Sequence, residues 1–76
     1  MAETNTKIYK YSIDDWVTYI PFPDVKTLSD IKHKALVLEV LVDDYIYDYY
    51  IVVDGTGEYK NVKASKLFPY VEEKQV

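Results

Sequence analysis

The apolar and polar positions of this chain alternate in short runs that turn-forming residues interrupt. Residues 16–23 begin with β-branched and aromatic side chains, which favour a strand. Pro21 and Pro23 end that strand, because proline cannot donate a hydrogen bond to a β-ladder. A shorter alternation over residues 8–11 predicts a short strand before it.

The middle of the chain predicts a loop followed by two strands. Residues 24–34 are polar apart from Leu28 and Ile31, so we expect a mobile loop with two apolar anchors. Residues 35–44 and 45–53 alternate with a period of two, which is typical of β-strands. The turn between the two strands is expected at Asp43 and Asp44. One face of the first strand carries Leu36, Leu38, Val40 and Val42, and the other carries Ala35, Val37, Glu39 and Leu41.

Glu39 predicts that the second of these faces is partly wet. In residues 45–53 neither face is apolar throughout, so we expect a bulge or twist to exchange the two faces part-way along that strand.

The end of the chain contains its strongest turn signal. Asp54-Gly55, followed by Gly57, favours backbone conformations with positive φ. Residues 59–64 then alternate as a strand, residues 65–68 are compatible with a 3₁₀ turn that ends at Pro69, and residues 70–71 can add a last short strand. Residues 1–7 and 72–76 are polar and are expected to be flexible tails.

Five or so short strands in so small a chain predict an all-β domain. Strands spaced in this way favour a small five-stranded barrel over residues 8–71, with a 3₁₀ turn before the last strand. The 76 residues make one domain, and the absence of cysteine means that no disulfide or thiolate metal site braces it. The core must come from the 49% of residues that are hydrophobic. We found no signal peptide and no apolar run near the ~20 residues of a membrane span, so a soluble, cytoplasmic protein is expected.

The charge of the chain argues against general nucleic-acid binding. The formal charge is −4, and all nine basic residues are lysines, so arginine is absent. Nucleic-acid binders carry a basic stripe, in which arginine is the preferred ligand of phosphate and guanine.

The segments DDWVTYIP, KALVLEVLVDD and YYIVVDGTGEYKNVKASKLFPY together resemble SH3-like barrels of the Tudor and KOW type. The resemblance covers residues 13–71, where Val62, Leu67 and Pro69 match the closing pattern of that family. Two features depart from it: the loop after the first strand is long, and Asp14-Asp15 replaces the usual glycine before that strand.

The resemblance implies a binding module. Many such domains hold a methylated lysine or arginine in a cage of rings with an acid, because a cation sits well on aromatic faces. The positions that correspond to such a cage are Tyr19, Phe22, Tyr50 and Asp54.

The second hairpin, residues 43–58, is rich in tyrosine and acid and contains no basic residue. Tyr45, Tyr47 and Tyr49 recur at every second position, so they would point outward together if Ile46 and Tyr50 lie inside. A ring ladder of this kind is typical of interfaces. Together with the rim of the first strand, the predicted partner-binding residues are Trp16, Tyr19, Phe22, Asp43, Asp44, Tyr45, Tyr47, Asp48, Tyr49, Tyr50 and Asp54.

Each of these features also has a structural interpretation. Trp16 can be a core or barrel-end residue, and cross-strand tyrosines stabilise sheets without any partner. The acids can be a solvated surface, can steer a basic partner, or can imitate a phosphate backbone. Lys60, Lys63 and Lys66 form a basic patch after the turn, which serves solubility, orients a partner, or favours head-to-tail self-association.

No motif indicates catalysis or a metal. His33 stands alone, the acids lack calcium-loop spacing, and no serine lies in a nucleophile elbow, so neither an enzyme nor a cofactor is predicted. We therefore expect a non-enzymatic module that binds a protein partner. The alternatives are a phage-type inhibitor that occupies a nucleic-acid site on a host protein, direct nucleic-acid binding through stacked tyrosines and lysines, and a structural subunit of a larger particle.

Overall fold

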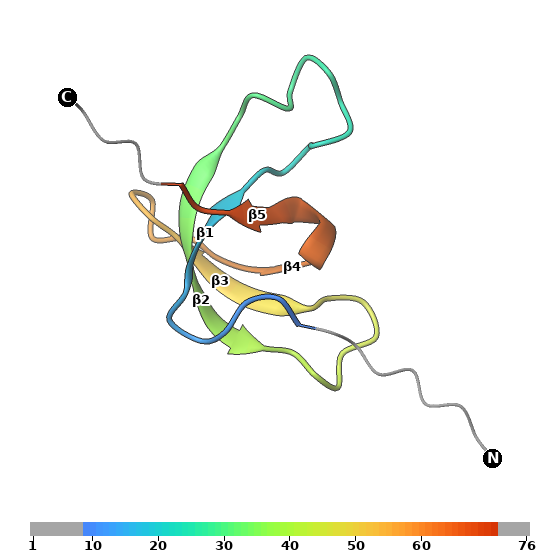
Figure 1. Cartoon of the computed structure of the whole chain (residues 1–76), viewed down its shortest axis with the longest axis vertical. Helices are drawn as coiled ribbons and strands as arrows, with labels where there is room; N and C mark the ends of the chain where they lie inside the picture. The colour runs from blue at the N-terminus through green and yellow to red at the C-terminus, as the bar shows by residue number, and fades with distance from the viewer. Residues whose placement is uncertain (1–8, 72–76) are drawn as a thin grey trace.

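A computed structural model describes residues 9–71, which form one antiparallel five-stranded sheet (Figure 1). The sheet order is β4-β3-β2-β1-β5. The strands are β1 (Trp16–Tyr19), β2 (His33–Val40), β3 (Tyr49–Val53), β4 (Tyr59–Val62) and β5 (Leu67–Pro69), and one 3₁₀ turn, η1 (Ala64–Lys66), precedes β5. The predicted all-β class, with five strands and a single 3₁₀ turn, is confirmed.

The sheet has two edges. Hydrogen-bonded pairing runs continuously from β4 to β5 through the three inner strands, but β4 and β5 do not pair with each other within residues 9–71. The sheet is strongly curved in Figure 1. The architecture is therefore an open, curved sheet, and the closure expected of a barrel is not seen.

The core is built from cross-strand rows of buried residues on one side of the sheet. Val17, Ala35 and Val53 are aligned in register across β1, β2 and β3. The next row pairs Val37 with Ile51. The four residues at the centre of the core are fully buried, namely Val17, Ala35, Val37 and Ile51. The last row places Val40, Tyr49 and Val62 opposite one another. Antiparallel partners share one face of a sheet, so these rows define the inner face of each strand.

The inner face of β2 corrects the sequence interpretation. Ala35 and Val37, on the face that Glu39 marked as wet, are fully buried, whereas Leu36 and Leu38 lie half-buried on the outer face. The register shifts between Val37 and Glu39, so a bulge there places Val40 rather than Glu39 against the core. The expected exchange of faces therefore occurs in β2 and not in residues 45–53, because β3 alternates regularly.

The loop between β2 and β3 also corrects the prediction. The strands end at Val40 and resume at Tyr49, so residues 41–48 form an eight-residue loop instead of a tight turn at Asp43 and Asp44. One Asp44 carboxylate oxygen accepts hydrogen bonds from the backbone N–H groups of Ile46 (2.7 Å) and Tyr47 (2.8 Å). An aspartate that bonds to backbone two and three residues later favours a turn over a strand.

The other boundaries are close to those expected. β1 ends before Pro21, and residues 20–32 form the loop that was expected over residues 24–34. Of its two expected apolar anchors, Leu28 is half-buried, but Ile31 is exposed. The last strand begins at Leu67, three residues earlier than predicted. Residues 9–11 are not a strand, although Tyr11 is buried; Ile8 and both predicted tails, 1–7 and 72–76, lie outside the described residues.

Three of residues 9–71 have positive φ. Gly55 (φ 93°) and Gly57 (φ 71°) form the turn after β3, as Asp-Gly predicted. Asp14 has a φ of 76°, and aspartate tolerates this region better than most residues. The backbone of Asp14 and Asp15 then extends the β1–β2 ladder, because it exchanges hydrogen bonds with Val37.

Tyr11 gives a prediction about pH. Its side chain is buried and its hydroxyl has no hydrogen-bond partner among residues 9–71. Burial, with a smaller contribution from the neighbouring Tyr49, raises the pKa of Tyr11 above its usual value of 10.0. The folded state then holds the Tyr11 proton more tightly than the unfolded state does. The resulting contribution of Tyr11 to the free energy of unfolding is fully present below pH 10.0 and is lost as the pH rises through the folded pKa.

We expect Tyr11→Phe to be neutral or to stabilise the protein by up to about 1 kcal/mol at neutral pH, because it removes a buried hydroxyl that lacks a partner. Above pH 10.0 the wild type should lose stability more steeply than the variant. Urea unfolding of both proteins across this pH range measures the difference. Parallel stability profiles would contradict the assignment.

Candidate functional site

The loop of residues 41–48 is held by its own acids. The Leu41 N–H donates to the Asp48 carbonyl (2.9 Å), which closes the loop at its base. Asp44 caps the backbone inside the loop, as described above, and the Asp48 carboxylate accepts a hydrogen bond from the Ala64 N–H (2.8 Å) at the start of η1. Two of the acids predicted to meet a partner therefore organise the loop and attach it to the 3₁₀ turn.

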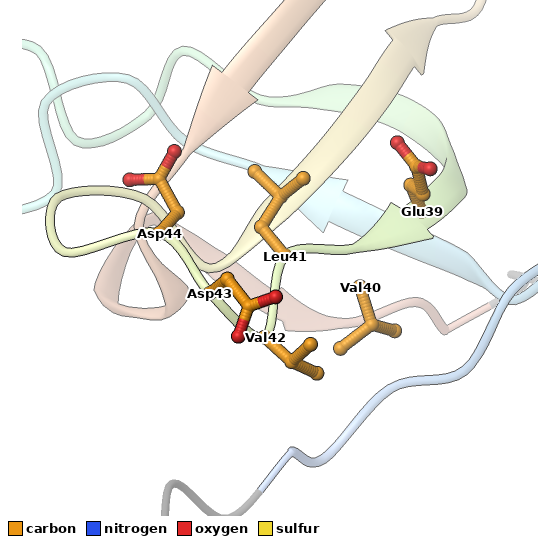
Figure 2. Close-up of a pocket in the computed structure, with 6 residues that line it drawn as sticks. All are labelled: Glu39, Val40, Leu41, Val42, Asp43 and Asp44. Carbon is orange, nitrogen blue, oxygen red and sulfur yellow. The ribbon is translucent and has the colours of Figure 1, made fainter.

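The beginning of this loop is a shallow hollow that opens to solvent. Figure 2 shows its six lining residues, Glu39, Val40, Leu41, Val42, Asp43 and Asp44. The side chains of Leu41 and Val42 point in different directions, and the carboxylates of Asp43 and Asp44 do not converge on one point. The hollow therefore lacks the convergent ligands that a cation site needs.

The predicted ladder of three tyrosines is wrong. Tyr45 is fully exposed in the loop and Tyr47 is half-buried, but Tyr49 lies in the core with 1% of its surface exposed. The ladder required Ile46 to lie inside, whereas Ile46 is 59% exposed. The physical reason is the loop: residues 45–48 are outside the strand, so the alternation of side chains begins only at Tyr49.

A different group of rings gathers on the outer face of the sheet. Trp16, Leu36, Val52 and Tyr59 are paired in register across β1, β2, β3 and β4. Leu36 and Val52 are half-buried in the middle of this row, while Trp16 and Tyr59 are 45% and 62% exposed at its ends. Together with Tyr50 and Tyr70, which contact the two ends, we call these residues the aromatic band.

Each end of the aromatic band is a pair of rings. Tyr50 stacks on Tyr59, with ring centroids 5.9 Å apart and an interplanar angle of 25°. At the other end, the Lys34 ammonium lies 4.4 Å from the Trp16 ring and 5.0 Å from the Tyr70 ring. Contacts of this length are cation–π interactions, so this end already holds a cation between two rings.

The four residues that the family resemblance assigned to a cage do not form one site. Tyr19 and Phe22 line a common hollow with His33 and Glu58 near the end of β1. Tyr50 lies on the opposite, outer face, because its neighbours Tyr49 and Ile51 fill the core. Asp54 is exposed in the turn after β3, outside the residues that line this hollow.

The eleven predicted residues therefore divide between separate places. Trp16 and Tyr50 join in the aromatic band, Tyr19 and Phe22 line the hollow beside β1, and Tyr49 belongs to the core. The remaining six residues lie in the loop of residues 41–48 or in the turn that follows β3, namely Asp43, Asp44, Tyr45, Tyr47, Asp48 and Asp54.

Sequence reasoning missed Tyr59, Tyr70 and Lys34. The available signal was that both faces of the segments 35–40 and 49–53 are largely apolar. One thin core covers only one face of a strand, so the second apolar face indicated another contact surface. The strand register, which the alternation does not contain, is needed to place Tyr59 in one row with Trp16. Tyr70 lies outside the strands and joins the band only through its contact with Lys34.

The described residues contain no group of three or more histidine, cysteine, aspartate or glutamate side chains placed to hold a metal ion. Nor does any helix within residues 9–71 have the length and apolar character needed to cross a membrane. Comparison with protein families, with curated proteins and with solved structures found no match to this chain.

Proposed function

We propose that this protein is a non-enzymatic binding module that contacts a protein partner through the outer face of its tyrosine-rich hairpin and its first strand. The observation that carries the proposal is the aromatic band, a row with exposed rings at its ends and half-buried aliphatic side chains between them, which crosses the sheet from β1 to β4. A contiguous exposed apolar patch is typical of an interaction site.

The composition of the aromatic band favours protein over nucleic acid. Tryptophan and tyrosine dominate the binding energy of protein interfaces, because their rings bury a large area at a small cost in side-chain entropy. Lys34, which contacts the band, lies between two rings, and the chain has no arginine and a net charge of −4. Backbone phosphates would therefore find little attraction on this face.

We further propose that the open sheet belongs to the SH3-like class of the Tudor and KOW type. The support is the order β4-β3-β2-β1-β5, the antiparallel pairing of β1 with β5, and the 3₁₀ turn directly before β5. The left-handed Asp14 adds to this support, because it occupies the position of the usual glycine.

The acidic residues supply less to the proposal than the sequence suggested. Asp44 and Asp48 accept backbone hydrogen bonds, so these carboxylates serve the loop itself. A phosphate mimic needs a dense array of outward acids, and we therefore place the inhibitor hypothesis below the protein-binding module. A structural-subunit role has no specific support in the fold.

The test compares the tagged wild type with two double variants in pull-downs from lysate of the source organism. Trp16→Ser/Tyr59→Ser removes both exposed ends of the aromatic band, and Tyr45→Ser/Ile46→Ser removes exposed side chains from the loop as a matched control. Truncating a hot spot costs ~2 kcal/mol or more. We therefore expect the band variant to lose a partner at least about tenfold, while the loop variant retains it.

Trp16 also reports binding directly, because it is the only tryptophan of the chain. Its emission should shift to shorter wavelength when the purified partner covers the aromatic band. Equal recovery of every partner by all three proteins, with circular dichroism showing that each is folded, would reject this surface.

A further inference from the structure

The inference concerns β4, which lies at one edge of the sheet. The Val53 N–H donates to the Glu58 carbonyl (2.8 Å), and residues 59–62 continue this register along β3. In an antiparallel ladder, hydrogen-bonded pairs alternate with non-hydrogen-bonded pairs. The pairs of Ile51 with Lys60 and of Tyr49 with Val62 are then the bonded ones, so Tyr59 and Asn61 direct their backbone N–H and C=O groups away from β3.

A groove runs beside this edge. One hollow, of ≈ 330 Å³, is lined by Phe22 and His33 on one side and by Glu58 and Lys60 on the other. A second, of ≈ 410 Å³, is lined by Tyr47, Asn61, Lys63 and Lys66 among others. Tyr19 lines both hollows, so they lie next to each other. We call the combined hollow the edge groove, and both parts have the ~300–1,000 Å³ that is typical of ligand pockets.

The edge groove is basic, although the protein as a whole is acidic. Lys60, Lys63 and Lys66 all line it, against a net charge of −4 for the chain. Lys66 has a structural contact, because its ammonium donates to the Pro21 carbonyl (2.7 Å) and lies 5.7 Å from the Phe22 ring. Lys60 lies 3.5 Å from Glu58 in a solvent-exposed ion pair, which contributes little to stability and can be exchanged for another carboxylate.

We propose that the edge groove binds an extended acidic segment of a protein partner, which pairs with β4 as an additional antiparallel or parallel strand. The outward backbone groups of Tyr59 and Asn61 would hold the main chain of the segment, as in other cases of strand addition to an open sheet edge. The lysines would attract its carboxylates, and the rings of Tyr19, Phe22 and Tyr47, which line the same groove, would contact the methylene groups of those acidic side chains. A single nucleic-acid strand fits this groove less well, since it offers no peptide groups at the spacing of a β-ladder.

This surface is distinct from the aromatic band, and the proposal does not depend on it. Tyr59 contributes its side chain to the band and its outward backbone groups to the β4 edge, so the test alters the lysines and leaves Tyr59 unchanged. A Trp16→Ser variant, in which the band is damaged, should still bind through the groove.

The probe is a short synthetic peptide of alternating threonine and glutamate, titrated into the ¹⁵N-labelled protein and followed by NMR. We expect the largest saturable shifts at the amides of Tyr59 and Asn61, with slower hydrogen exchange at both. N-methylation of alternate peptide nitrogens on the pairing side should abolish binding, and methylation on the other side should not. Added salt should weaken binding, because the attraction is partly between exposed charges.

Matched charge variants separate the groove from the overall charge. Lys60→Gln/Lys63→Gln should lower the affinity about tenfold or more, as expected for the loss of charges that face a ligand. Lys26→Gln/Lys32→Gln removes the same charge from the loop between β1 and β2, where both lysines are exposed, and should leave the affinity unchanged.

Three outcomes would overturn the proposal. The first is no saturable shift at Tyr59 or Asn61 by ~1 mM peptide, the range of very weak complexes. The second is equal binding of a peptide with lysine in place of glutamate. The third is tighter binding of oligothymidine than of the acidic peptide, with the same dependence on Lys60 and Lys63, which would assign the groove to single-stranded nucleic acid.

Discussion

Replacing Tyr49 with alanine is expected to destabilise the protein by about 3–5 kcal/mol, whereas replacing Tyr45, four residues earlier, should change stability by less than about 0.5 kcal/mol. Both residues belong to the same tyrosine-rich segment, and their sequence context does not distinguish them. Small domains are stable by only about 5–15 kcal/mol, so the Tyr49→Ala variant should be close to unfolding at room temperature.

The reason is the position of Tyr49 at the centre of an aromatic cluster. Its ring contacts the rings of Tyr9 and Tyr11 edge-on, with centroids 5.9 Å and 5.7 Å away. Its hydroxyl accepts a hydrogen bond from the Tyr11 N–H (3.3 Å), and its pairing partners are Val40 and Val62. Truncating Tyr49 would leave a cavity that a thin core cannot close. Tyr45 is fully exposed, so truncating it leaves no cavity.

Urea unfolding followed by circular dichroism measures both variants against the wild type. Tyr49→Phe is the informative control, because it keeps the ring and removes one hydrogen bond, and should cost about 1 kcal/mol. If Tyr45→Ala were the more damaging change, Tyr45 rather than Tyr49 would have to lie in the core, and the register of β3 would be wrong.

Replacing Ile51 with alanine should destabilise the protein by about 2–5 kcal/mol, while Val52→Ala should cost less than about 1.5 kcal/mol. Ile51 is fully buried and pairs with Val37 in the central row of the core. Val52, the next residue on the same strand, is half-buried on the outer face, within the aromatic band.

The same unfolding experiment measures this pair, and the comparison is internally controlled because both residues are β-branched and occupy one strand. The comparison also tests whether the aromatic band is packed less tightly than the core. Similar losses from the two substitutions would mean that the outer face is packed as tightly as the core, which is incompatible with a solvent-facing binding surface.

The two core predictions bear on function through the hairpin. β3 carries the core on one face, with Tyr49 and Ile51, and the aromatic band on the other, with Tyr50 and Val52. A rigid inner face holds the outer rings in a fixed arrangement, which lowers the entropy cost of binding. Substitutions on the outer face should therefore affect binding more than folding, and those on the inner face the reverse.

The sequence alone was sufficient for the class of the fold. Period-two alternation predicted strands in residues 35–44 and 45–53, which overlap β2 and β3. Pro21 marked the end of β1, and Asp54-Gly55 with Gly57 marked the turn before β4. These features are local, because each follows from the conformational preferences of a few neighbouring residues. The absence of arginine and of cysteine likewise restricted the chemistry without any structure.

The tertiary structure alone decided which face of each strand lies inside. A period of two separates the side chains into two sets but does not say which set meets the core, and a shift of one residue exchanges them. The bulge between Val37 and Glu39 makes that shift in β2, and the Asp44 cap removes residues 45–48 from β3. Both effects depend on partners that alternation does not specify, and so do the aromatic band and the edge groove, which are formed by residues from strands far apart in the chain.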